Sequence, residues 1–91
     1  MKSNQKKWCM YVVECSDGSL YCGVTTDLDR RFQEHSLGTG AKYTRSRLPV
    51  LVVYSEKHEN RSQAQIAESA FKKLTRKKKE EYIRYEKNKD R

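Results

Sequence analysis

Residues 8–25 read WCMYVVECSDGSLYCGVT, a span with two apolar runs on either side of a polar turn. β-Branched and aromatic residues are frequent in both runs, which favours strands at residues 8–15 and 19–25. Asp17 and Gly18 between the runs are typical of a hairpin turn. The span therefore predicts an antiparallel pair of strands at the centre of the fold.

The length of the hairpin loop sets which side chains share a face of the sheet. A two-residue loop would place Tyr11 and Tyr21 on opposite faces, whereas a three-residue loop with a left-handed Gly18 would pair Cys15 with Ser19 and place both tyrosines on one face. We favour the three-residue loop. It gives a continuous apolar surface on the other face, made of Met10, Val12, Leu20, Cys22 and Val24.

Helix signals follow the hairpin. Thr26 and Asp29 have the spacing of a capping box, so a helix is expected from Asp27 to about Ser36. Residues 37–49, LGTGAKYTRSRLP, contain two glycines and the only proline, which predicts a long exposed loop.

The C-terminal half predicts one strand and two helices. The apolar run at residues 50–55 indicates a third strand. Asn60, with Gln63 three residues later, caps a helix that Thr75 ends, and Thr75 also caps a last helix. The apolar positions of the two helices are Ala64, Ala67, Ala70, Phe71 and Leu74, then Tyr82, Ile83 and Tyr85. The expected fold is α+β, a small antiparallel three-stranded sheet flanked by helices in the order β-β-α-β-α-α.

The composition favours a small basic domain. The chain has 91 residues, of which 35% are hydrophobic and 35% charged, and its formal net charge is +8 at pH 7. We expect a single domain at residues 8–87, between tails at residues 1–7 and 88–91. No apolar run approaches the roughly 20 residues of a membrane helix, and the N-terminus lacks the apolar segment of a signal peptide, so a cytoplasmic location is expected.

Positive charge is concentrated near the C-terminus. Residues 72–91 carry ten basic and four acidic side chains. Such a surface attracts polyanions, and nucleic acid is the commonest polyanion in a cytosol. The alternative for this segment is a solvated helix that is kept soluble by its charge.

The three cysteines do not have the spacing of a metal site. Cys9, Cys15 and Cys22 lack the C-x-x-C pattern, so we expect free thiols that pack as small hydrophobic side chains. The alternative is a zinc site, which would also need His35 or His58.

Arg31 and His35 are four residues apart in the first predicted helix, beside an apolar seam of Leu28 and Phe32. A row of side chains at the edge of such a seam can face a cleft between helix and sheet. Glu68 lies on the flank of the apolar stripe of the next helix, which is an unusual place for a surface carboxylate. An ordinary ion pair along that helix is the alternative for Glu68.

Residues 10–15 and 21–35, MYVVEC and YCGVTTDLDRRFQEH, resemble the GIY-YIG nuclease domain. The likeness is strongest with small single-domain bacterial members, in which GAKYTR and a following proline also have counterparts, and it extends from about Trp8 to Leu74. The resemblance implies a set of site residues: the signature tyrosines Tyr11 and Tyr21, the signature glycine Gly23, the catalytic arginine Arg31, a histidine of some branches at His35 and the metal-binding Glu68.

Two positions depart from the family pattern. Cys9 replaces the first glycine of the signature, a change that is tolerated among small members. Val24 follows Gly23 where the repair-endonuclease branch has a lysine, a residue able to help activate a tyrosine. The general base is therefore either Tyr11 or Tyr21, and we favour Tyr11.

The resemblance implies an endonuclease that uses Mg²⁺ or Mn²⁺ to hydrolyse phosphodiester bonds in DNA, as in DNA repair. Arginine donors match phosphate geometry, and Mg²⁺ often takes one protein carboxylate and completes its shell with water and phosphate. A tyrosine base would need nearby positive charge from Arg31, the metal or His35 to lower its pKa from about 10. Repair intermediates, branched DNA, single-stranded DNA and RNA all stay open as substrates.

The predicted loop at residues 37–49 adds basic groups next to His35. Lys42, Arg45 and Arg47, with Tyr43 among them, are expected to hold a nucleic-acid backbone and to stack on an unpaired base. A mobile charged loop is the alternative. For the whole chain, the main alternative is a nucleic-acid-binding module of the same fold with little or no turnover, to which a protein partner supplies specificity.

Overall fold

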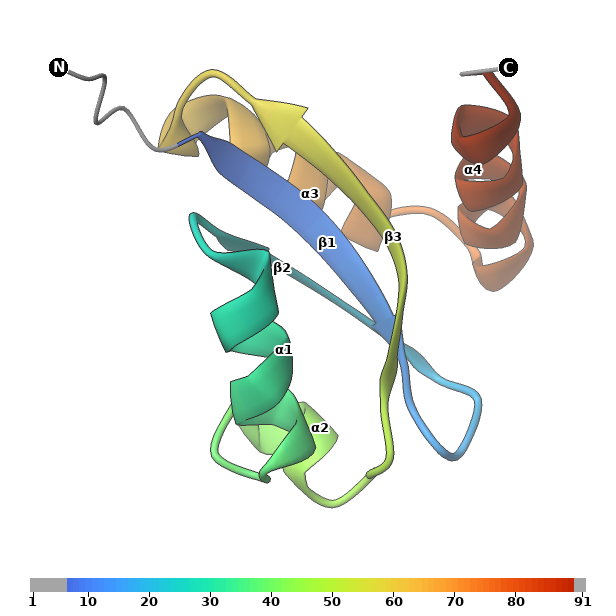
Figure 1. The fold of residues 1–91 in the computed structure, drawn as a ribbon. Coiled ribbons are helices and arrows are strands. Elements are labelled where there is room, and N and C mark those ends of the chain that lie inside the picture. The colour runs from blue at the N-terminus through green and yellow to red at the C-terminus, as the bar shows by residue number, and fades with distance from the viewer. Residues whose placement is uncertain (1–6, 90–91) are drawn as a thin grey trace, which may run out of the picture.

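The computed structural model describes residues 7–89, with side chains described as far as residue 87. The fold is α+β, as predicted, and contains a three-stranded sheet of β1 (Trp8–Glu14), β2 (Leu20–Thr25) and β3 (Leu51–His58). The strand order is β2-β1-β3, and both neighbours run antiparallel to the central β1 (Figure 1). The third strand is longer than expected and extends to His58.

The hairpin has the three-residue loop. The amide of Cys15 donates to the carbonyl of Ser19 over 2.8 Å, and Gly18 adopts a φ of +84°, in the left-handed region that favours glycine. Tyr11 is paired with Gly23 and Val13 with Tyr21, so the two tyrosines lie on one face of the sheet. The predicted register is therefore confirmed.

The helices are α1 (Leu28–Ser36), α2 (Lys42–Arg45), α3 (Arg61–Lys72) and α4 (Arg76–Lys89). The predicted caps of the last two are confirmed, because the Asn60 side chain accepts from the Gln63 amide and Thr75 Oγ1 accepts from the Lys78 amide.

The predicted cap of α1 was wrong by one residue. Asp27, not Thr26, caps this helix, and its carboxylate accepts from the Arg30 amide over 3.2 Å. The amide of Asp27 is in turn bound by Thr25 Oγ1 over 3.1 Å. A carboxylate at the cap also suits the positive end of the helix dipole.

The prediction of a long exposed loop at residues 37–49 was also wrong in part. Helix α2 lies within it, so the element order is β-β-α-α-β-α-α. Thr44 in this helix is fully buried, although Tyr43 and Arg45 on either side of it are exposed. The short helix is held by contacts to the rest of the protein, which a local sequence pattern does not contain.

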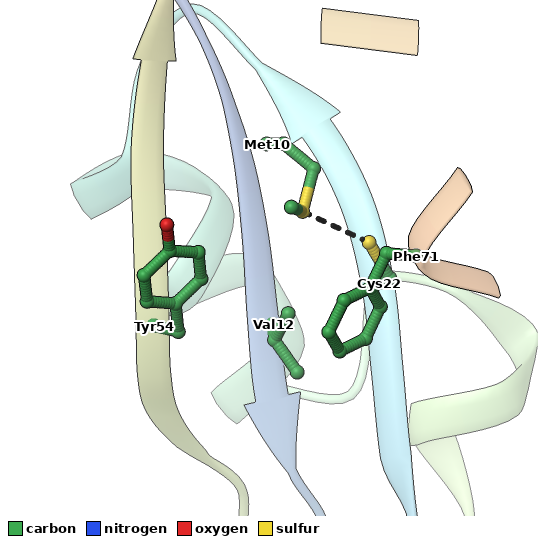
Figure 2. Packing of buried hydrophobic residues seen from close by; sticks show 5 residues of the cluster. All are labelled: Met10, Val12, Cys22, Tyr54 and Phe71. Carbon is green, nitrogen blue, oxygen red and sulfur yellow. Dashed lines mark hydrogen bonds between the residues drawn. The ribbon is translucent and has the colours of Figure 1, made fainter. Parts of the chain in front are cut away.

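Each face of the sheet carries its own hydrophobic cluster. Helix α3 covers one face, where Phe71 packs on Met10, Val12, Cys22 and Tyr54 (Figure 2). The Cys22 thiol lies 3.1 Å from the sulfur of Met10. The cluster on the other face contains Tyr11, Val13, Cys15 and Val50, and Leu28 and Phe32 of α1 pack against it.

Helix α4 packs on the sheet through Tyr82 and Ile83, and a carboxylate of β3 adds a polar contact. Glu56 on β3 accepts from the hydroxyls of Tyr54 and Tyr82, each over 2.6 Å, and its other oxygen lies 2.6 Å from Nε2 of His58. Tyr85, which was also expected among the apolar positions of α4, is 66% exposed and does not belong to this packing.

Most of the two predicted tails, residues 1–6 and 90–91, lies outside the described residues. Helix α4 itself runs through residues 88 and 89. Among residues 7–89, no helix has the length and apolar character that crossing a membrane requires.

Candidate active site

The pairing of β1 with β2 places the ring of Tyr11 across Gly23. A methyl group added at Gly23 would lie 2.6 Å from the Tyr11 hydroxyl oxygen and 2.8 Å from Cζ, closer than atoms can approach. Gly23 is therefore needed for close packing and not for a special backbone angle. The Tyr11 hydroxyl therefore lies over Gly23, on the face of the sheet that α1 covers.

Helix α1 brings two of its side chains to that hydroxyl. Nε2 of His35 lies 3.0 Å from the Tyr11 oxygen, and Nε of Arg31 donates to the same oxygen over 3.2 Å. Tyr11 is 1% exposed and His35 0%, while the Arg31 side chain is 30% exposed and also donates to Glu34 over 2.9 Å. Arg31 and His35, which are four residues apart on α1, therefore both form hydrogen bonds with the hydroxyl of Tyr11.

Tyr21 completes the group of aromatic rings. Its ring centroid lies 5.5 Å from that of His35 in an edge-to-face arrangement, and 6.0 Å from that of Tyr43, with which it is stacked. Tyr21 is only partly buried. The structure therefore brings Tyr11, Tyr21, Arg31 and His35 together on one face of the sheet.

Burial sets the protonation of the central pair. Loss of hydration raises the pKa of Tyr11 to about 12, and the hydrogen bond and charge of Arg31 only partly oppose this effect. Burial, together with the positive charge of Arg31, lowers the pKa of His35. Near pH 7, Tyr11 is thus a neutral phenol and His35 a neutral imidazole. The expected lowering of a tyrosine pKa by nearby positive charge is not found at Tyr11.

Two residues that contact His35 were missed in the sequence. Thr44 Oγ1 lies 2.7 Å from Nδ1 of His35. A methyl group added at Gly40 would lie 2.6 Å from the same nitrogen, so the backbone there lies against the imidazole ring. Gly40 could have been noticed in the sequence, since glycine permits a close approach of the backbone to another group. Thr44 could not, because it lies in a polar segment without a periodic pattern that would predict its burial.

The four residues expected to bind nucleic acid lie together. Lys42, Tyr43, Arg45 and Arg47 line an open surface pocket of about 580 Å³ with Ser46. Among the described residues, Lys42 and Arg45 form no ion pair, so their charges face solvent. A phosphate backbone could therefore meet two free cations beside the Tyr21 ring.

Arg47 has a different environment. Its Nε lies 3.0 Å from Oδ2 of Asp17, its Nη1 donates to the carbonyl of Tyr43 over 2.8 Å, and its guanidinium lies 4.0 Å from the centre of the Tyr43 ring. These bonds tie the α2 segment to the hairpin turn. Arg47 and the ring of Tyr43 are therefore already engaged within the protein.

Glu68 comes from the side of the sheet opposite Tyr11 and His35. It belongs to α3, which packs on the opposite face of the sheet, and its carboxylate pairs with Lys72 over 3.0 Å. The hydrogen bond that Lys72 donates to Glu68 raises the pKa of Lys72, and the same amine interacts electrostatically with Cys22 and Tyr21 of β2. The Glu68 side chain is 20% exposed. The pair therefore lies near β2, an outer strand of the sheet.

The donors that a metal ion would meet are few. In the described part of the chain, no three His, Cys, Asp or Glu side chains are grouped in a way that could hold a metal. Glu68 offers a single carboxylate. Mg²⁺ accepts such a site, because it usually keeps several water ligands and binds one or two carboxylates together with substrate phosphate. The single carboxylate thus fits a metal that arrives with nucleic acid.

Comparison with known proteins gives a consistent result. The GIY-YIG catalytic domain matches residues 7–82 of the chain. A UPF0213 protein of Enterococcus faecalis is 55% identical over 83 residues, which are 89% of this chain and 94% of that protein. A UPF0213 protein of Bacillus cereus is 54% identical over 79 residues, which are 87% of this chain and 82% of that protein.

Two structures solved by solution NMR are also similar. Protein EF2693 of E. faecalis has 52% identity and a TM-score of 0.63, over 92% of this chain and 90% of that one. The UPF0213 protein BH0048 of Bacillus halodurans has 42% identity and a TM-score of 0.58, over 87% of this chain and 84% of that one.

Proposed function

The chain belongs to the GIY-YIG family, and from this membership we propose that it is an endonuclease that hydrolyses phosphodiester bonds in DNA with a divalent metal ion. One observation carries the proposal: Tyr11, Arg31 and His35 meet at a single hydroxyl beside free cationic side chains. Hydrolysis needs an activated water and a cation against the phosphoryl oxygens. This cluster supplies both kinds of group.

Arg31 stabilises charge on the reacting phosphate. One of its N–H groups is used by Tyr11 and another by Glu34, which leaves the remaining donors of the guanidinium for phosphate oxygens. Burial opposes its charge, but the hydrogen bonds to Tyr11 and Glu34 raise the pKa of Arg31. Its charge is therefore present at every pH at which the enzyme would work.

Tyr11 and His35 activate water together. A phenol whose pKa is about 12 is a poor base by itself, but the neutral His35 can take the hydroxyl proton while the Tyr11 oxygen takes one from water. The water oxygen forms a bond to phosphorus and the bond to the leaving oxygen breaks. The leaving oxygen, on the opposite side of phosphorus, takes a proton from solvent, and the imidazolium returns its own proton through Tyr11 to solvent after the product has left.

Glu68 is the residue that would hold the metal, Mg²⁺ or Mn²⁺. The bound ion would supply Lewis-acid polarisation of the phosphate and ease departure of the leaving oxygen. To hold the metal, the Glu68 carboxylate would have to release the amine of Lys72, with which it is paired. Lys72 is exposed enough to move away at little cost.

Lys42 and Arg45 position the DNA. Their charges lie on α2, next to the stacked rings of Tyr21 and Tyr43, and they attract the backbone without reading its sequence. Arg47 acts differently from its neighbours, since it holds Asp17 and orders this surface. An unpaired base would stack on Tyr43 only by displacing Tyr21 or the Arg47 guanidinium, which occupy its ring in the free protein.

A cytoplasmic location and a part in DNA repair belong to the same proposal. They rest on the substrate, because chromosomal DNA lies in the cytoplasm of the bacteria from which the similar proteins come. The single-domain organisation at residues 8–87 is likewise proposed, in keeping with the match to residues 7–82.

The direct test is cleavage of branched, flapped and single-stranded DNA with Mg²⁺, before and after EDTA. Tyr11→Phe and Glu68→Ala should each slow cleavage by about 100-fold or more. Tyr85→Phe and Glu81→Ala, at exposed positions of α4, are matched controls and should cleave like the wild type. Unchanged activity in both site variants would refute the assigned site.

A nucleic-acid-binding module with little turnover is the second candidate. It is favoured by one observation, the pairing of Glu68 with Lys72 on a helix that packs against the face of the sheet opposite Tyr11. A protein partner would then supply specificity. This function predicts salt-sensitive DNA binding that persists in EDTA, with no cleavage of any substrate by the wild type.

A further inference from the structure

Thr44 is a buried hydroxyl with two partners. It is 0% exposed, and its oxygen lies 2.7 Å from Nδ1 of His35 and 3.0 Å from the carbonyl oxygen of Ala41, to which it donates. A hydroxyl has one proton to give and two lone pairs that accept. The proton that Thr44 gives to Ala41 is therefore not available to His35.

This arrangement favours one position for the proton on the imidazole. Thr44 donates to the Ala41 carbonyl, which also accepts from the Arg45 amide over 3.1 Å, and Thr44 Oγ1 in turn accepts from His35. The neutral imidazole then carries its proton on Nδ1 and leaves Nε2 without one. The bare Nε2 is the nitrogen that lies 3.0 Å from the Tyr11 hydroxyl.

The other end of the chain of hydrogen bonds requires the same tautomer. Arg31 can only donate, so the Tyr11 oxygen accepts from it and the Tyr11 proton needs another acceptor. Among the described residues that bond the Tyr11 hydroxyl, only His35 can accept. With the proton on Nε2 instead, the Tyr11 hydroxyl would be buried without an acceptor, which is costly.

We propose that Thr44 is a positioning residue, which holds His35 in the Nδ1–H tautomer and so aims a bare Nε2 at Tyr11. The inference rests on the proposed nuclease function, in which Nε2 accepts the Tyr11 proton. Thr44 itself is fully buried and therefore out of reach of the substrate. It acts through His35, and the carbonyl of Ala41 fixes its direction.

The backbone before α2 holds the ring in place as well. Gly40 lies so close to the imidazole that an added methyl group would be 2.6 Å from Nδ1 and 3.0 Å from Cγ. The His35 ring is therefore packed between this backbone and the ring of Tyr11. Arg47, bound to Asp17 and to the Tyr43 carbonyl, fixes the segment that carries Thr44.

The charged and titratable groups around His35 come from three elements. Tyr11 of β1 and Tyr21 of β2 contact its ring, and Arg31 and Glu34 of α1 act on its charge. None of them contacts Nδ1 in the hydrogen bonds of the described residues. Among the described residues, Thr44 is therefore the hydrogen-bond partner of Nδ1.

The test is the tautomer of His35, measured by nitrogen-15 NMR of the imidazole in the protein without metal or DNA. The wild type should show a protonated Nδ1 and a bare Nε2. Tyr11→Phe removes the bond at Nε2 but leaves Thr44, and should keep this tautomer. Tyr11→Phe with Thr44→Val should give a mixture with a substantial Nε2–H form, and Tyr11→Phe with Thr44→Ser should restore the Nδ1–H form.

A protonated Nε2 in the wild type or in Tyr11→Phe, or an unchanged Nδ1–H form in the Tyr11→Phe and Thr44→Val double variant, would overturn the inference. If that double variant does not fold, the spectra of the wild type and of Tyr11→Phe decide. These spectra need no substrate. Absence of cleavage by the wild type would thus contradict the proposed function and leave the tautomer measurement standing.

Cleavage kinetics supply a second readout. Thr44→Val alone should reduce the rate of the chemical step about 10-fold or more and shift the acid limb of its pH profile to lower pH, since Nε2 loses basicity when Nδ1–H has no acceptor. Thr44→Ser should recover most of the rate. A Thr44→Val enzyme with the rate and pH profile of the wild type would contradict the positioning role.

Discussion

The hydroxyl of Tyr11 lies 3.0 Å from Nε2 of His35, although the two residues are 24 positions apart in the chain. Strand β1 supplies the phenol and helix α1 the imidazole, and both side chains are buried. A neutral pair at this distance can pass a proton without holding a charge at rest.

Gly23→Ala should destabilise the protein by about 1–3 kcal/mol, because the new methyl group would lie 2.6 Å from the Tyr11 hydroxyl. Urea unfolding measures the loss. In a Tyr11→Ala background the same change should cost much less, since the clashing ring is gone. An equal cost in both backgrounds would show that Tyr11 is not the reason for the glycine.

Glu56→Gln should destabilise the protein by about 1–3 kcal/mol, because Glu56 accepts from Tyr54 of its own strand and from Tyr82 of α4 and so links α4 to the sheet. Burial opposes its charge, but hydrogen bonds from these tyrosines and His58 hold the pKa of Glu56 below its usual range. The stabilisation is therefore complete above the ordinary glutamate pKa of about 4.3 and is lost as the pH falls through the lowered folded value.

Urea unfolding of the wild type and Glu56→Gln at pH about 7 and about 3 checks this dependence. The difference between the two proteins should shrink at the lower pH. Glu59→Gln, in an exposed ion pair with Lys7, is the control and should change stability by less than about 1 kcal/mol at either pH. A difference that grows in acid contradicts the role of the Glu56 carboxylate.

Lys42→Ala and Arg45→Ala should weaken DNA binding and lower its salt dependence. Each lost phosphate contact reduces the slope of log K against log salt by about 1. Lys57→Ala, an exposed lysine on β3, is the matched control and should leave the slope unchanged. Fluorescence anisotropy over a range of salt concentrations measures the slopes, and equal slopes in all four proteins would exclude this surface.

Cleavage should fall in acid, because His35 must be neutral to accept the Tyr11 proton. Burial and Arg31 lower the pKa of His35, so the acid limb should lie below the usual histidine value of about 6.5. Rates measured from pH about 5 to 8 under single-turnover conditions test this. A rate that rises as the pH falls would mean that the protonated imidazole is the active form.

The sequence was informative where local chemistry sets the geometry. Gly18 supplies the left-handed residue of a three-residue loop, and the alternation of side chains along the strands then puts Tyr11 and Tyr21 on one face. The spacing of Arg31 and His35 similarly follows from one helix. These relationships need only a few neighbouring residues, so the shared face of the tyrosines and the common row of Arg31 and His35 could be predicted.

Other relationships depend on contacts between distant segments. Helix α2 has four residues and no periodicity, and its place is set by Thr44 on His35 and by Arg47 on Asp17. The start of α1 was predicted one residue too early, because both Thr26 and Asp27 are good capping residues.

The pKa of Tyr11 and the position of Glu68 also depend on the whole fold. The pKa of a phenol reflects the balance of burial and charge, and burial is known only from the packed structure. Glu68 was correctly expected on the flank of an apolar stripe, but its helix covers the face opposite Tyr11. A helical pattern does not state which face of a sheet the helix will cover.

The central claim is that the Tyr11 and His35 pair activates water at a phosphodiester. The most direct test is the single-turnover rate of DNA cleavage with Mg²⁺ for the wild type, Tyr11→Phe, His35→Ala and the double variant, each checked for folding. Each single variant should lose about 100-fold or more, and the double variant should lose no more than the worse single, since the two groups act as one unit. Full activity in Tyr11→Phe, or losses that multiply in the double variant, would contradict the claim.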